Sequence, residues 1–90
     1  MNDEKVIADE CIRKWGVNSQ LGIAIEECAE LIVKIIKRSR EVNGSSDYDI
    51  CNEIADVEIM MFQLRQIYDN KIIDEIKEKK LKRLKERLGI

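Results

Sequence analysis

The chain has 90 residues, 38% of them charged, and a formal net charge of −2. This length makes one domain, near the lower limit of what a single hydrophobic core stabilises alone. A slightly acidic chain lacks the basic surface that general nucleic-acid binding needs. Because the sequence contains no His, we exclude a His general base, a catalytic triad, His-ligated zinc or iron, and Glu-x-x-His di-iron sites.

The same composition favours helices. The sequence contains no Pro, four Gly and few aromatic residues, which is typical of helical proteins with solvated faces. We therefore expect an all-α fold, a small bundle of about four helices in a single domain that spans residues 1–90. Charges interrupt every apolar run well before the ~18 residues of a membrane span, so we expect no signal peptide and no membrane partner.

The first two helices are expected at about residues 3–15 and 20–40. The first has apolar residues at helical spacing and ends at Gly16, a candidate C′ residue. Asn18 and Ser19 are the N-cap candidates for the second helix, which ends in basic residues that suit a helix C-terminus. Cys11, Cys28 and Cys51 all fall among apolar helical positions. We expect buried thiols in a reducing cytoplasm.

A turn with the sequence EVNGSSD, residues 41–47, separates the second helix from the third. The third helix is expected at about residues 48–68, with Asp47 or Asp49 as its cap. The pair Asp69-Asn70 indicates a short break or kink, although a continuous helix is an alternative. The last helix, at about residues 71–88, has isoleucines and leucines against a highly charged face, and Gly89 ends it.

Two acidic pairs lie on the central helices. Glu27 and Glu30 belong to the run EECAE, residues 26–30, and Glu53 and Asp56 belong to EIAD, residues 53–56. At this spacing both carboxylates of a pair project from one face of a helix. Packing of the two helices would gather four carboxylates, which protons or cations must then neutralise. We expect a hard divalent metal, Mg²⁺ or alternatively Mn²⁺, because carboxylate oxygens suit these ions.

A helical wheel distinguishes the acids of the third helix. Glu53 projects within an apolar stripe and Asp56 lies at its edge. The stripe consists of Ile50, Ile54, Val57, Met61, Leu64 and Tyr68. A carboxylate in such a stripe is costly unless it is paired, protonated or metal-bound. A solvated acid would instead lie beside Glu58 and Arg65 on the opposite side, so Glu53 is the strongest indication of a site.

A strip on the second helix runs from acid to base, through Glu27, Glu30 and Lys34, with Arg38 at its margin. This order is complementary to a metal–polyphosphate complex, in which Lys and Arg bind the oxygens that the cations leave uncovered. Two alternatives stay open. The carboxylates can form a structural salt-bridge network with basic residues one turn away. Lys34 and Arg38 can have the ordinary role of cations near a helix C-terminus.

Both central helices carry apolar residues on a second side. These are Ile23 and Val33 on the second helix and Ala55, Ile59 and Phe62 on the third. A helix that is apolar on two sides is buried on two sides. In so short a chain the second layer is expected to come from another subunit. We therefore expect homo-oligomerisation, a homodimer or tetramer, to complete the bundle.

The two acidic runs resemble the EE-x-x-E…E-x-x-D motif of the MazG-like all-α nucleoside triphosphate pyrophosphohydrolases. EECAE lies within GVNSQLGIAIEECAELI and EIAD begins EIADVEIMMFQL, so the resemblance covers roughly residues 15–68. It implies a helical bundle that binds Mg²⁺ and hydrolyses a nucleoside triphosphate to the monophosphate and pyrophosphate. By position, Glu27, Glu30, Glu53 and Asp56 match the metal ligands, through which they act in catalysis. Glu26 matches the leading acid, for which orienting a metal-bound water is one role.

The substrate contacts are less well defined, because the ending KKLKRLKERLGI lacks the Asn, Tyr and Pro that many family members carry. Lys80, Arg83 and Arg87 are candidate phosphate ligands or solvated surface residues. Trp15 is a candidate platform for the base or a core residue, and Gln20 is a candidate hydrogen-bonding partner for a base edge. Two other functions stay open: a non-catalytic helical interaction module, and a degenerate family member that binds nucleotide without turnover.

Overall fold

The computed structural model describes residues 2–40 and 44–90, and within these ranges it contains helices and no strand. The helices are α1 (Asn2–Trp15), α2 (Val17–Arg40), α3 (Asp47–Ile67) and α4 (Asn70–Leu88). The predicted all-α class with about four helices is confirmed. None of the described helices is both long enough and apolar enough to cross a membrane.

α1 and α2 meet at Gly16, which ends α1 as predicted. Its φ of +88° is left-handed, a conformation that Gly adopts without steric cost. The N–H of Gly16 donates to the carbonyl of Ile12 at 2.9 Å, and its own carbonyl accepts from the N–H of Gln20 at 3.1 Å. One residue therefore ends α1 and begins α2. The prediction that Asn18 or Ser19 caps α2 is wrong, because both lie inside the helix.

α3 begins with a capping box at Ser46, and not with Asp47 or Asp49 as the cap. The hydroxyl of Ser46 accepts from the N–H of Asp49, and the carboxylate of Asp49 accepts from the N–H of Ser46, both at 3.1 Å. This reciprocal pair satisfies two backbone donors at the helix start. Of the predicted turn, residues 41–43 lie outside the described residues, and residues 44–46 are non-helical as expected.

The predicted break between the last two helices is confirmed. α3 ends at Ile67, and Asp69 caps α4 by accepting from the N–H of Ile72 at 3.1 Å. Arg65 on α3 donates to Asn70 at 2.6 Å and to Asp74 at 2.8 Å. Gly89, with φ +71°, ends α4 as predicted.

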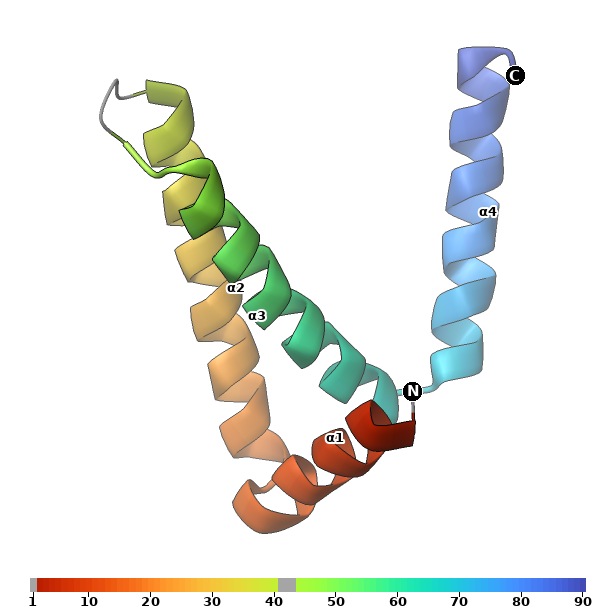
Figure 1. Cartoon of the computed structure of the whole chain (residues 1–90). Helices are drawn as coiled ribbons and strands as arrows, with labels where there is room; N and C mark the ends of the chain where they lie inside the picture. Colours follow the sequence, from red (N-terminus) through yellow and green to blue (C-terminus); the bar gives the residue numbers. More distant parts are fainter. Residues whose placement is uncertain (1, 41–43) are drawn as a thin grey trace.

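α2 and α3 run antiparallel and form the main helix pair, whereas α4 stands apart from it (Figure 1). α1 lies across one end of the pair and contacts both helices, and α4 contacts only α3. The radius of gyration is 16.1 Å, compared with about 12 Å for a compact domain of this length. The described chain is therefore an open arrangement and not a closed bundle.

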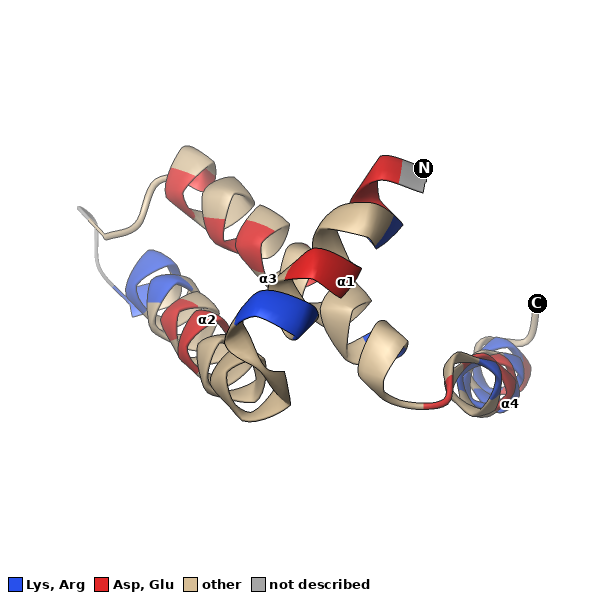
Figure 2. Cartoon of the chain, turned by 90° about the horizontal axis from the view of Figure 1, so that it is seen from below, with Lys and Arg blue, Asp and Glu red and all other residues tan. Residues whose placement is uncertain are grey.

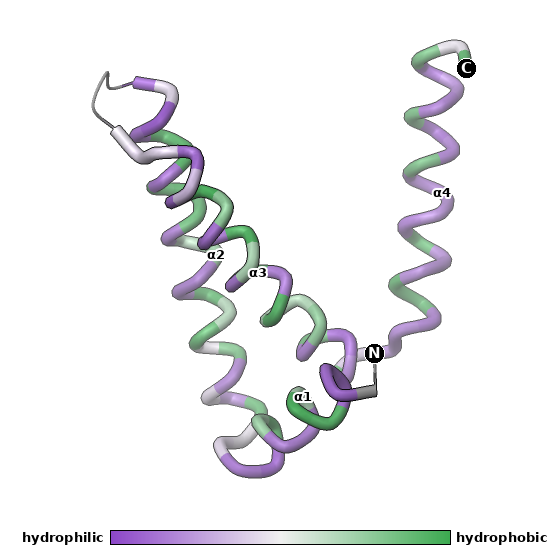
Figure 3. The backbone as a smooth tube through the Cα atoms, in the orientation of Figure 1, coloured by the Kyte–Doolittle hydropathy of each residue, from purple (hydrophilic) through white to green (hydrophobic). Residues whose placement is uncertain are grey.

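Few side chains are buried in this arrangement. The buried apolar residues are Ala8, Ala24 and Met60, and the buried polar residues are Gln20, Ser45, Glu53 and Gln63. Hydrophobic positions recur along α2, α3 and α4 alike (Figure 3), and many of their large side chains are exposed. The prediction of buried cysteines is wrong: Cys11 and Cys28 are half-buried and Cys51 is exposed. The reason is that one chain covers their helix faces only in part.

Candidate metal centre

The acidic pairs of α2 and α3 face each other. Because α2 and α3 are antiparallel, residues that come later along α2 lie opposite residues that come earlier along α3. Carboxylate oxygens of Glu27, Glu30 and Glu53 all lie within 4.8 Å of one another. Asp56 is close enough to Glu27 and Glu53 for its charge to raise the pKa of both. The structure thus brings together Glu27, Glu30 and Glu53, with Asp56 beside them.

Glu53 is the most perturbed acid of this carboxylate cluster. Its side chain lies in the helix interface, where the residue is 5% exposed. Burial, then a hydrogen bond with Glu30 and the charges of Glu30, Glu27 and Asp56, raise the pKa of Glu53 to about 7. Burial, followed by the charges of Asp56 and Glu30, also raises the pKa of Glu27. Four ionised carboxylates are therefore unfavourable here unless a cation neutralises them.

Two oxygens of the carboxylate cluster lack a hydrogen-bond partner. Within the described residues, Oε2 of Glu27 and Oε2 of Glu53 are buried and accept from no donor. A buried polar atom without a partner is costly and needs an explanation. The ion pairs in the described ranges involve none of the cluster's acids, so the structural salt-bridge alternative is not observed. A set of carboxylate oxygens with unfilled acceptors fits a hard cation such as Mg²⁺ or Mn²⁺.

The basic end of α2 continues from the carboxylate cluster. Figure 2 shows acidic segments along α3 and the middle of α2, followed by basic segments at the C-terminal end of α2. Lys34 is half-buried one turn beyond Glu30. Hydrogen bonds with Ser46 lower the pKa of Asp49, and the charge of Lys34 adds to this effect. Arg38 donates from Nε to Asp47 at 3.2 Å, a solvent-exposed pair of the kind that contributes little to stability.

Two buried glutamines, one on α2 and one on α3, lie on the same helix faces as the acids but nearer to α1. Gln20 precedes Glu27 by seven residues, and Gln63 follows Asp56 by seven, so each lies two turns from an acid on one face. In the part of the chain that the structure describes, Nε2 of Gln20 and Oε1 of Gln63 are buried without a hydrogen-bond partner. Gln20 was predicted as a site residue, whereas Gln63 was missed, although its seven-residue spacing from Asp56 is visible in the sequence.

The remaining predicted contacts lie outside the cluster. Glu26 is exposed on α2. Trp15 is 54% exposed at the end of α1, with Lys14 Nζ at 5.5 Å from its ring centre, so it is not the core residue of the alternative interpretation. Lys80, Arg83 and Arg87 line a separate pocket on α4, which does not contact α2.

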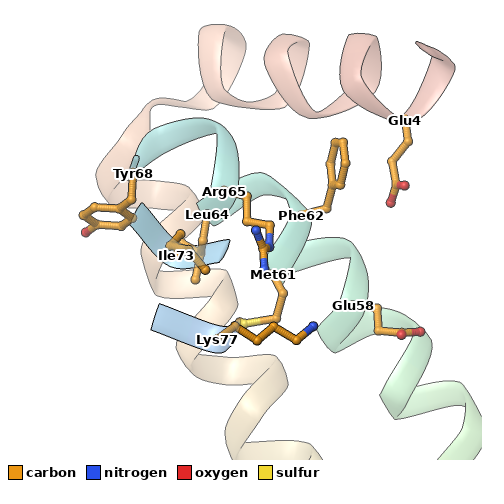
Figure 4. Close-up of a pocket in the computed structure, with 9 residues that line it drawn as sticks. All are labelled: Glu4, Glu58, Met61, Phe62, Leu64, Arg65, Tyr68, Ile73 and Lys77. Atoms are coloured by element: carbon orange, nitrogen blue, oxygen red, sulfur yellow. The ribbon is translucent and has the colours of Figure 1, made fainter. Parts of the chain in front are cut away.

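A pocket of about 920 Å³ lies between α1, α3 and the beginning of α4 (Figure 4). Met61, Phe62, Leu64 and Ile73 contribute apolar surface to it, and its lining also includes the charged residues Glu4, Glu58, Arg65 and Lys77. None of the cluster's acids lines this pocket. It therefore belongs to a different surface from the carboxylates.

The fold and the site together define an all-α protein with a carboxylate cluster between two antiparallel helices. Comparison of the chain with models of protein families, with curated proteins and with solved structures found no match in any of the three. What the protein does must therefore be inferred from its own residues and their geometry.

Proposed function

We propose that this protein is a nucleoside triphosphate pyrophosphohydrolase that depends on Mg²⁺, or alternatively Mn²⁺, and converts an NTP or dNTP to the monophosphate and pyrophosphate. The resemblance of EECAE and EIAD to the MazG-like motif implies this reaction. The observation that supports it best is Glu53, a buried acid with an unpartnered oxygen and a pKa of about 7. Its nearest charged neighbours are other acids, so a divalent cation would relieve the repulsion that this geometry imposes.

Glu27, Glu30 and Glu53 would hold the metal, with Asp56 as a further ligand. Their oxygens converge from two helices that are themselves packed together, so the ligands are held by rigid elements and not by a loop. When bound, the metal would supply an activated water and neutralise charge on the phosphates. Glu26, exposed beside Glu27, is the residue we assign to orienting that water.

Lys34 and Arg38 would bind phosphate oxygens. They follow the acids along α2, so a chain of phosphates can extend from the acids toward the C-terminal end of that helix. Arg38 can exchange its exposed partner Asp47 for a phosphate at little cost, because surface ion pairs are weak and Arg–phosphate pairs are strong.

The nucleoside would lie toward the other end of the helix pair. Gln20 offers a buried amide for a base edge, and Trp15 offers an exposed aromatic face at the adjoining end of α1. Lys80 and Arg83 remain candidates for phosphate binding only if α4 of another copy brings them to the site. We also expect a homodimer or tetramer in the cytoplasm, where the chain's free thiols would persist.

The enzyme proposal is tested with matched variants of two acids on α3. Glu53→Gln removes the central ligand, whereas Glu58→Gln changes an exposed acid that is not part of the cluster. We expect Glu53→Gln to lower pyrophosphate release at least about a hundredfold and Glu58→Gln to leave it unchanged, with both variants equally helical by circular dichroism. Full activity in Glu53→Gln would contradict the metal assignment. No pyrophosphate from any nucleotide with the wild-type protein would contradict the enzyme class.

A further inference from the structure

α4 presents an apolar stripe that nothing in the described chain covers. The stripe includes Ile76, Leu81, Leu84 and Leu88, which are between 49% and 70% exposed. No residue of α4 is buried, and the helix contacts only α3. Helices in proteins are stabilised mainly by packing of such a face, and isolated ones are marginal in water. The stripe on α4 therefore needs a partner surface.

A matching apolar groove lies on α2 and α3. It is lined only by apolar side chains and a cysteine, and among them Ile25 is 70% and Ile32 is 58% exposed. Met61 and Leu64 line this groove and also the pocket at the beginning of α4 shown in Figure 4. The apolar surface is therefore continuous from α2, across α3, to the place where α4 begins.

The area of uncovered surface matches that of a dimer interface. The chain exposes 7327 Å², whereas a monomeric globular protein of this mass is expected to expose about 5,400 Å². The excess of about 1,900 Å² falls within the roughly 1,000–2,500 Å² that each copy buries in an obligate homodimer.

The distribution of charge favours contact between α4 and the groove-bearing helices of another copy. Residues 70–88 contain eight Lys or Arg and four Asp or Glu, whereas residues 1–69 contain eight and fourteen. α4 is thus basic and the rest of the chain is acidic. Two α4 helices would repel each other, but α4 and the acidic part of a second copy attract.

Polar contacts cross the junction between α3 and α4, and α4 stands apart from the groove of its own chain (Figure 1). Arg65 donates to Asn70 and to Asp74, across the junction between α3 and α4. We propose that the protein is a symmetric dimer in which α4 of each copy lies in the apolar groove on α2 and α3 of the other. This exchange covers the stripe and the groove of both copies and does not depend on the enzymatic proposal.

The test measures the dimer dissociation constant of the full chain by sedimentation equilibrium. We expect a wild-type dimer, and a constant at least tenfold higher for Leu84→Asp in the α4 stripe and for Ile25→Asp in the groove. The control, Val6→Asp, places the same charge at an exposed apolar position on α1 and should leave the constant unchanged. If Ile25→Asp unfolds the chain, Leu84→Asp decides, because no residue of α4 is buried within one copy.

Mixing the two variants tests the exchange itself. A heterodimer of Leu84→Asp and Ile25→Asp copies keeps one intact contact, between the groove of the first and α4 of the second. We expect the mixture to associate more tightly than either variant alone. A monomeric wild type, as when α4 folds back onto its own groove, would overturn the proposal. The proposal would also be overturned if either substitution left the dissociation constant unchanged, or if the mixture associated no more tightly than the separate variants.

Discussion

Glu53 should control how the affinity for a divalent metal changes with pH. A metal that binds the carboxylate cluster must displace the proton of Glu53, whose pKa is about 7. A group with this pKa is about one-tenth ionised at pH 6 and about nine-tenths ionised at pH 8, so the association constant should rise about tenfold between these values. Glu27, whose pKa burial also raises, contributes in the same direction.

Isothermal titration calorimetry with Mn²⁺ at pH 6, 7 and 8 measures this dependence in metal-free protein. Buffers of different ionisation enthalpy would show about half a proton released per metal at pH 7 from Glu53 alone. Glu53→Gln should bind more weakly and lose most of the pH dependence. Equal affinity at pH 6 and pH 8 in the wild type would show that metal does not displace a proton from Glu53, as would a full tenfold rise in Glu53→Gln.

Three further predictions concern stability and substrate binding. The pKa of Glu53 is about 7 in the folded chain and 4.5 in the unfolded chain, so between these pH values only the folded chain keeps this proton. The melting temperature of the metal-free protein should therefore fall as the pH rises from 4.5 to about 7. A melting temperature that rises over this range would contradict the prediction. Ser46→Ala removes one half of the capping box and should lower the free energy of unfolding in urea by about 0.5–2 kcal/mol; an unchanged free energy of unfolding would contradict this role of the Ser46 hydroxyl. Lys34→Ala should raise the KM for nucleotide more than it lowers kcat, whereas Lys37→Ala, at an exposed position, should change neither; equal effects would remove Lys34 from the site.

The helices were largely predictable because their ends have local causes. Gly16 and Gly89 end helices as expected, since Gly adopts a left-handed backbone easily. The start of α2 was missed because Gly16 supplies both the end of one helix and the beginning of the next. The cap of α3 was missed because an aspartate and a serine are equally good caps in isolation. Only the reciprocal hydrogen bonds between Ser46 and Asp49 distinguish them.

The proximity of the acids was predictable because two neighbouring helices with a short connection pack antiparallel. Their i,i+3 pairs then meet on facing sides. Gln63 was missed because a single uncharged residue carries no motif, although its seven-residue spacing from Asp56 places it on the buried face. The burial of Cys51 was mispredicted for a different reason: helical periodicity identifies an apolar face but not which molecule covers it.

Product analysis tests most directly whether the carboxylate cluster supports pyrophosphohydrolysis. Wild-type protein would be incubated with each NTP and dNTP in Mg²⁺ or Mn²⁺, and the products separated by ion-exchange chromatography. We expect monophosphate and pyrophosphate in equal amounts from at least one nucleotide, and neither product after the metal is chelated. Diphosphate and phosphate as products would contradict pyrophosphohydrolysis, as would nucleotides that all remain intact with either metal.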